Sequence, residues 1–217
     1  RRLREAGIEV LPNALARSQQ EALAQAAAMG FPVVAKIASE QIVHKSDIGG
    51  VQVGLKNAEQ VAAAWVDIMA SAARHRPDAT IDGLLIEKMA PQGGIELMIG
   101  VTRDPVFGHV MTFGMGGIYV EILRDVTRRM LPIGAEDAAA MVREMRCFPL
   151  LDGARGRPRA DLKALEALLL RVSAFVVANA DRIEEMDLNP VWLGAEGDGA
   201  LPLDAVIIER AAPEVSA

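Results

Sequence analysis

Two short apolar runs enclose a loop of unusual composition near the start of the chain. Residues 31–38 (FPVVAKIA) and 51–55 (VQVGL) are rich in Val and bounded by Gly and Pro, which predicts two strands. Residues 44–50 (HKSDIGG) connect them and carry an imidazole, an ammonium, a hydroxyl, a carboxylate and two glycines. Glycines let the backbone approach a ligand closely and aim N–H groups at one anion. The loop therefore suits a polyphosphate, unless it is only a solvated hairpin turn.

Neither common nucleotide fingerprint is present in this region. The loop is not a Walker A sequence, and no GxGxxG follows the first strand. Lys36 stands in the middle of the first apolar run, where a lysine either extends its ammonium to water or meets an anion.

Size, charge and cysteine content limit the class of protein. A chain of 217 residues can fold as one large domain or two small lobes. No apolar run reaches the roughly 18 residues that a membrane span needs, and no signal peptide opens the chain, so we expect no membrane partner. The net charge of −6 argues against a general nucleic-acid binder. Because the chain starts at Arg1 rather than Met, we expect it to be part of a longer protein.

Cys147 is the single cysteine, so the chain can form no internal disulfide. This fits a reducing compartment and predicts a cytoplasmic location. A lone cysteine among apolar residues usually belongs to the core, so we do not expect a catalytic thiol there.

Four helices are expected from caps and apolar spacing. Ser18 begins a capping box with Glu21 and a helix that ends near Met29. Asn57 caps a second helix, which ends before Pro77 and leaves His75 as a solvated cation in its last turn. The third covers residues 135–145, and Asp161 caps the fourth. The basic loop at residues 152–159 between them reads as exposed and without a role.

Short strands dominate the middle of the chain. We expect them at residues 84–89, 95–101 and 107–113, with a turn at 103–105. A second glycine-rich loop at 114–117 leads into a further strand at 119–123. Glu96 is a carboxylate in an otherwise apolar strand. One explanation is that this is an edge strand with Glu96 on its solvent-exposed face.

The end of the chain predicts a hairpin with a polar face. In residues 183–193, Glu185, Asp187 and Asn189 alternate with Met186 and Leu188, and Trp192 is assigned to the face of Met186. Residues 194–199 form the turn and 200–209 the second strand. If Leu193 pairs with Ala200, Asn189 lies opposite Asp204 with Cβ atoms about 5 Å apart.

A carboxylate and an amide oxygen at that distance can share Mg²⁺, which commonly takes one or two carboxylates plus phosphate oxygens. The alternative is a buried Asp204 that is satisfied by Asn189 or by backbone N–H groups.

Several stretches, in order, resemble one known family over nearly the whole chain. They are FPVVAKI, HKSDIGGV, GIELMIGVTRDPVFG, FGMGGIYVEILRDV, RGRPRADLKAL and EMDLNPV followed by PLDAV. They are similar to the ATP-grasp domain of the NDP-forming acyl-CoA synthetases, the superfamily of ADP-forming acetyl-CoA synthetase, in which HKSDIGGV and EMDLNPV are the specific motifs. The resemblance implies an α/β (α+β) ATP-grasp fold with two lobes, each a mainly antiparallel sheet flanked by helices. The smaller lobe would cover about residues 10–85 and the larger about 86–217.

The resemblance also implies a role for individual residues. Lys36 looks like the lysine that holds nucleotide phosphates, and the phosphate loop would comprise Lys45, Ser46, Gly49 and Gly50. Glu87 and Met89 would meet the adenine edge, largely through backbone groups, and Glu96 would accept from ribose hydroxyls. Asn189 and Asp204 look like the Mg²⁺ ligands; Asp187 lies nearby but is one methylene shorter than the Glu that is frequent in the family. His44 resembles a histidine that carries a phosphoryl group, Glu121 would orient it, and Arg128 is a candidate phosphate cation.

The function implied is the nucleotide half of an acid–CoA ligase (ADP-forming), which binds ATP or ADP with Mg²⁺. The CoA-binding and acyl-phosphate steps would belong to partner domains or an α-type subunit. The same domain is fused to acetyltransferase domains in some protein-lysine acetyltransferases, so a non-catalytic, regulatory module is the alternative.

Overall fold

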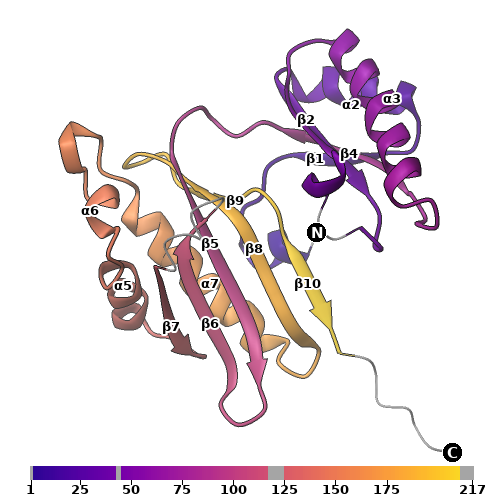
Figure 1. The fold of residues 1–217 in the computed structure, drawn as a ribbon. Coiled ribbons are helices and arrows are strands. Elements are labelled where there is room, and N and C mark those ends of the chain that lie inside the picture. Colours follow the sequence, from indigo (N-terminus) through magenta and orange to yellow (C-terminus); the bar gives the residue numbers. More distant parts are fainter. Residues whose placement is uncertain (1, 43–44, 117–124, 211–217) are drawn as a thin grey trace, which may run out of the picture. The chain divides into compact units, whose positions relative to one another are not determined.

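A computed structural model describes residues 2–42, 45–116 and 125–210 of the chain (Figure 1). The predicted strand at 119–123 lies outside these ranges, as do the site candidates His44 and Glu121. The chain divides into two compact units, Leu11–Ala90 and a second formed by Arg1–Val10 with Pro91–Ala217. Each unit is described by itself.

The unit Leu11–Ala90 is a four-stranded antiparallel sheet with two helices. Its elements are β1 (Asn13–Ala16), α2 (Gln19–Met29), β2 (Val33–Ala38), the 3₁₀ turn η1 (Ser46–Ile48), β3 (Val51–Leu55), α3 (Ala58–His75) and β4 (Gly83–Lys88), with strand order β1-β4-β2-β3. Small and branched side chains of the helices, such as Ala26 and Ile68, form a core with Ile37 and Ile86 from one face of the sheet. The opposite face carries Lys36 and Glu87.

Both predicted helix caps in this unit are confirmed. Ser18 Oγ accepts a hydrogen bond from the Glu21 N–H at 3.2 Å, and Asn57 Oδ1 accepts from the Gln60 N–H at 2.9 Å. The Glu21 carboxylate accepts from the Arg17 N–H at 2.7 Å, one residue before the expected partner. Each cap satisfies a backbone donor that has no partner within the helix.

The other unit contains a six-stranded antiparallel sheet of order β10-β8-β5-β6-β7, with β9 paired to β8. Its strands are β5 (Ile95–Asp104), β6 (Gly108–Met115), β7 (Val126–Met130), β8 (Ile183–Leu193), β9 (Ala200–Pro202) and β10 (Val206–Glu209). Its helices are α1 (Arg2–Glu5), α5 (Ala135–Arg143), α6 (Phe148–Leu151) and α7 (Leu162–Ala178), with the 3₁₀ turn η2 (Ala154–Gly156). The two sheets with flanking helices agree with the predicted fold class.

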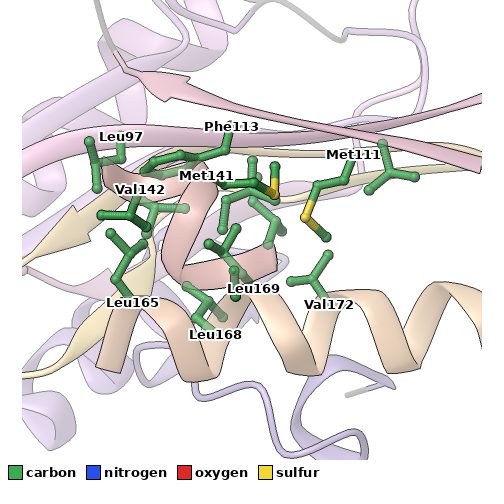
Figure 2. Packing of buried hydrophobic residues seen from close by; sticks show 14 of the residues in the cluster. Leu97, Met111, Phe113, Met141, Val142, Leu165, Leu168, Leu169 and Val172 are labelled. Carbon is green, nitrogen blue, oxygen red and sulfur yellow. The ribbon is translucent and has the colours of Figure 1, made fainter. Parts of the chain in front are cut away.

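The core of this unit lies between the sheet and helices α5 and α7 (Figure 2). Leu97, Met111 and Phe113 point from the strands towards Met141 of α5 and Leu169 of α7. Because α5 and α7 pack on this face, the side chains that alternate with the core residues occupy the opposite face, which we call the open face. No helix in the described ranges combines the length and apolarity that crossing a membrane requires.

The strand β8 contains an extra residue that changes which side chains face the core. Leu97 lies opposite Val191 and Ile99 opposite Leu188, so two residues of β8, Asn189 and Pro190, correspond to Met98 alone. This β-bulge shifts the alternation by one residue. Trp192 therefore pairs with Glu96 on the open face, and its predicted position on the face of Met186 is wrong.

The predicted second strand of the hairpin is also interrupted. Leu203 to Ala205 lie outside the ladder, between β9 and β10. Leu203 still donates its N–H to the Pro190 carbonyl at 2.8 Å, so the chain stays beside β8. Elements β1, α1 and α6 were not predicted because four residues are too few to establish a period.

Asp161 fixes the start of α7 and the turn of the hairpin together. Its Oδ1 accepts from the Ala164 N–H at 3.0 Å, as predicted for a cap. Its Oδ2 accepts from the N–H groups of Gly197 and Gly199 at 3.0 and 3.1 Å. One carboxylate thus satisfies three backbone donors from two segments.

Candidate functional site

Lys36 and Glu87 form an ion pair on the sheet face of Leu11–Ala90 that α2 and α3 leave uncovered. Lys36 lies opposite Leu85 and Val34 opposite Glu87, which makes Lys36 and Glu87 diagonal neighbours on adjacent strands. Lys36 Nζ is 2.6 Å from Glu87 Oε2, and the two side chains are 12% and 13% exposed. The lysine thus has a carboxylate partner at short range.

The predicted phosphate loop enters β3 beside Lys36. Val51 lies directly opposite Lys36, and a Cβ at Gly50 would stand 2.7 Å from Ile37 Cγ2, so glycine is needed for the close approach to β2. Gly49, with φ of +65°, donates its N–H to the Ser46 carbonyl, and Gly50 donates to the Lys45 carbonyl. Both N–H groups are used within the loop in this conformation, and their role in phosphate binding stays a prediction.

The predicted adenine contacts differ in their surroundings. Glu87 lies inside the central strand β4, with Asn13 and Val34 opposite it on the two neighbouring strands, so its backbone belongs to the ladder. Met89 comes after the end of β4 and donates its N–H to the Pro32 carbonyl at 3.4 Å. Of the two residues, Met89 is therefore better placed for a backbone contact with a ligand.

In the unit with the six-stranded sheet, a row of directly opposed residues crosses the open face. It runs from Val206 through Asp187, Gly100 and Thr112 to Arg128. Asp187 and Arg128 are thus three strands apart, about 14 Å at the usual strand spacing. Glu96 shares this face and is exposed, although β5 is a central strand rather than an edge strand.

Asp204 falls opposite Asn189 when the register of the flanking ladders is continued through the unpaired residues 203–205. Leu193 pairs with Ala200, which confirms the assumption, and Asp187 pairs with Val206 in the same register. Asp204 and Asn189 stand between these two paired stretches. The three predicted Mg²⁺ ligands Asp187, Asn189 and Asp204 are therefore neighbours on two adjacent chain segments.

The electrostatics of this group favour a cation. Burial raises the pKa of Asp187, and the nearby carboxylates of Glu185 and Asp204 raise it further. The ionised form of Asp187 is therefore energetically unfavourable in this environment, and a divalent cation beside it would stabilise that form. In the described part of the chain, no three His, Cys, Asp or Glu side chains are grouped so as to hold a metal ion. The donors nonetheless fit Mg²⁺, which commonly uses one or two carboxylates with phosphate oxygens and water.

Replacing Asp187 by Asn should raise the melting temperature at neutral pH without Mg²⁺. The raised pKa means that the folded state loses stability as the pH rises and Asp187 ionises, so removing the charge restores that stability. The gain should disappear as the pH falls and the wild-type carboxyl takes up its proton. Thermal melts across this pH range measure both effects, with Asp181→Asn at an exposed position as control. An unchanged or lower melting temperature would contradict this electrostatic account.

The remaining candidates outside the site have structural explanations. Burial raises the pKa of Cys147 to about 12, and the adjacent Asp125 contributes, which agrees with a core thiol rather than a nucleophile. His75 is exposed at the end of α3, with Nδ1 2.9 Å from the Ser71 carbonyl. In the basic loop, Arg159 pairs with Asp152 at 2.5 Å.

Two contributors to the sites were missed by sequence reasoning. The carboxylate of Glu185 raises the pKa of Asp187. The period-two alternation had placed the two residues on one face but had not indicated this effect. The contact between Lys36 and Glu87 depends on the pairing of β2 with β4, which no local pattern reveals.

Comparison with known proteins identifies the family. A family model described as an ATP-grasp domain matches residues 2–208. The chain belongs to the ATP-grasp family. This ATP-grasp chain is 46% identical over 206 residues to the acetate–CoA ligase [ADP-forming] II subunit beta of Pyrococcus furiosus, covering 95% of the chain and 87% of the relative. It is 42% identical to acetate–CoA ligase [ADP-forming] I of Archaeoglobus fulgidus, covering 94% of the chain but 29% of that protein.

A solved structure resembles the ATP-grasp chain with a TM-score of 0.81 and 39% identity, covering 96% of the chain and 88% of the other. It is the dinucleotide forming acetyl-coenzyme A synthetase 1 of Ca. Korarchaeum cryptofilum in complex with coenzyme A and Mg-AMPPCP. Its phosphohistidine segment points towards the nucleotide binding site.

Proposed function

We propose that this chain is the nucleotide-binding part of an ADP-forming acyl-CoA synthetase. The observation that supports the proposal is the closeness of Asp204 to Asp187, on the strand that also carries Asn189, with the pKa of Asp187 raised by burial and by the carboxylates of Glu185 and Asp204. Such a group favours a hard cation, and Mg²⁺ is bound in proteins by carboxylates together with nucleotide phosphates. The similarity to an ADP-forming ligase beta subunit supports the reaction class.

The residues proposed to bind ATP or ADP are those that the family resemblance implies. In Leu11–Ala90, Lys36 with the loop residues Lys45, Ser46, Gly49 and Gly50 would bind phosphates, and Met89 would meet the base. In the other unit, Glu96 would accept from ribose hydroxyls and Arg128 would neutralise phosphate charge. Bound Mg²⁺ would supply further neutralisation of the phosphates, held by Asn189 and Asp204 with Asp187 beside them. Phosphoryl transfer needs such positioning and charge more than covalent chemistry.

His44 would carry the phosphoryl group between the partner domains and the nucleotide. A neutral imidazole nitrogen would attack the phosphorus of an acyl phosphate, forming an N–P bond and releasing the carboxylate. A terminal oxygen of ADP would then attack the same phosphorus, breaking the N–P bond and forming ATP. We propose that Glu121 orients the imidazole. The net reaction converts acyl-CoA, ADP and phosphate into acid, CoA and ATP.

Partner domains would complete the enzyme. One relative is named as a beta subunit, and the chain spans 29% of another, which supports the proposal that CoA binding lies elsewhere. We propose an α-type subunit or fused domains as the partner, and a cytoplasmic location because Cys147 is the single cysteine. Nucleic acid and membrane are not expected as partners.

The chain should gain thermal stability from ADP with Mg²⁺. A ligand that binds only the folded state stabilises it by about 2.7 kcal/mol at a hundredfold excess over Kd. Thermal melts with ADP, with Mg²⁺ alone and with both measure this, and the combination should exceed the separate shifts. No shift at millimolar nucleotide would contradict the proposed function.

A further inference from the structure

The ion pair between Lys36 and Glu87 is unusual because it is nearly buried although it lies outside the hydrophobic core of its unit. Both side chains are nearly buried, at 12% and 13% exposure, yet neither belongs to the core that α2 and α3 form with the sheet. Removing two charges from water is unfavourable unless they are closely paired, and replacing such a pair by apolar groups is frequently neutral or stabilising. The pair therefore needs an explanation beyond stability.

The backbone around Glu87 is held in place by hydrogen bonds to the strands on both sides, which restricts where its carboxylate can lie. Glu87 lies in a strand paired on both sides, opposite Asn13 and Val34. Lys36 lies in the adjacent strand β2, next to the point where the loop at residues 45–50 joins β3. A long, flexible lysine side chain is thereby held at 2.6 Å from a carboxylate that the ladder anchors.

We propose that Glu87 is a positioning residue, whose carboxylate holds the Lys36 ammonium in the place where it meets a nucleotide phosphate. This inference rests on the proposed function of Lys36. The arrangement has two opposing consequences. Glu87 fixes the cation in advance, which reduces the loss of side-chain freedom when phosphate binds. Its negative charge also repels the incoming phosphates, so it lowers affinity while it preserves geometry.

These consequences separate positioning from two simpler roles. A purely structural pair would change stability but leave the preference for phosphate-bearing ligands unaltered. A direct ligand of the nucleotide would weaken binding when removed. A positioning carboxylate, in contrast, should strengthen phosphate binding when Gln replaces it, because Gln keeps an oxygen that accepts from the Lys36 ammonium and removes the charge that repels phosphate.

The experiment is a double-mutant cycle on the full chain with Glu87→Gln, Lys36→Met and the combined variant. Isothermal calorimetry gives Kd for ADP with Mg²⁺ and for adenosine, which lacks phosphate. Glu87→Gln should lower Kd for ADP about threefold or more and change Kd for adenosine by a smaller factor. Lys36→Met should raise Kd for ADP about tenfold or more, because a charged hydrogen-bond donor is lost and Glu87 then faces the phosphates without its partner.

Thermal melts of the same variants without nucleotide test the pair itself. Lys36→Met should lower the melting temperature by about 10 °C because it leaves a nearly buried carboxylate without this cation, and the combined variant should recover at least half of that loss. Glu166→Gln is the matched control, since it removes the carboxylate of the Arg143 ion pair in the other unit and should leave Kd for ADP unchanged.

The outcomes distinguish this inference from the proposed function. If the wild-type chain binds no ADP, both are overturned. If wild type binds ADP and Glu87→Gln weakens or does not change that binding, only the positioning role is overturned. Equal effects of Glu87→Gln on ADP and adenosine would overturn it too, because positioning of a phosphate cation must depend on the phosphates.

Discussion

His44→Ala should abolish ATP formation in the enzyme assembled with its partner domains. If His44 carries the phosphoryl group, its removal leaves no nitrogen to form the N–P bond, and turnover should fall on the order of 10³-fold or more. ADP affinity should change little, because Lys36, the loop and Mg²⁺ would still hold the nucleotide. Coupled measurement of ATP production at saturating ADP, with calorimetry on the same variant, separates the two quantities.

Phosphorylation of the chain gives a direct second measurement for His44. Wild type incubated with γ-labelled ATP and Mg²⁺ should acquire label that is lost in acid and retained in alkali, as expected for an N–P bond, and His44→Ala should not. His75→Ala is the matched control, because His75 is exposed at the end of α3 and should keep both label and turnover. If His44 only donated a hydrogen bond to phosphate, its loss should weaken binding by about 1–3 kcal/mol and leave turnover at saturation. Normal turnover of His44→Ala would instead overturn the carrier role of His44.

Asp161→Ala should be among the most destabilising single substitutions in the unit with the six-stranded sheet. The variant loses the cap of α7 and leaves the Gly197 and Gly199 N–H groups without their acceptor. A lost cap costs about 1 kcal/mol, and hydrogen bonds to a charged group contribute about 1.5–3 kcal/mol each but are not additive. We expect the free energy of unfolding to fall by about 3 kcal/mol and the melting temperature by about 10 °C.

Denaturant unfolding of Asp161→Ala and Asp161→Asn provides the measurement. The Asn variant retains one acceptor oxygen and should lose less stability. Asp152→Ala removes the carboxylate of an ion pair with the exposed Arg159 and should change stability by less than about 1 kcal/mol. A loss in Asp161→Ala no larger than in Asp152→Ala would show that the three hydrogen bonds contribute little.

The parts of the fold that sequence predicted best are those with a local signal. Ser18, Asn57 and Asp161 cap helices because a side-chain oxygen three residues before a backbone N–H is a geometric requirement of the helix start. The strand β8 has the bounds that alternation indicated. The candidate residues of the metal site came from the same alternation combined with the Leu193–Ala200 register, which a six-residue turn fixes locally.

The features that sequence did not predict depend on strand order or on a defect in regular structure. The Lys36–Glu87 contact requires β4 to lie beside β2, although the long helix α3 separates them in the chain. The use of the Gly49 and Gly50 N–H groups inside their own loop depends on the turn geometry, since composition specifies only that glycine is allowed there. The break between β9 and β10 likewise leaves the apolar pattern of residues 200–209 unchanged.

The bulge in β8 has a consequence for anyone who aligns this domain with its relatives. Directly before Asn189, the even-numbered Met186 and Leu188 face the helices; after Pro190, odd-numbered Val191 and Leu193 do so. A relative that lacks the extra residue must therefore be aligned with a gap between Leu188 and Val191, although a gapless match looks continuous. Without that gap, every position of β8 after the bulge would be compared with a residue from the opposite face of the sheet. The indole of Trp192, which lies beside Glu96, would then be aligned with interior aliphatic side chains. Positions on the core face would wrongly be expected to tolerate polar residues.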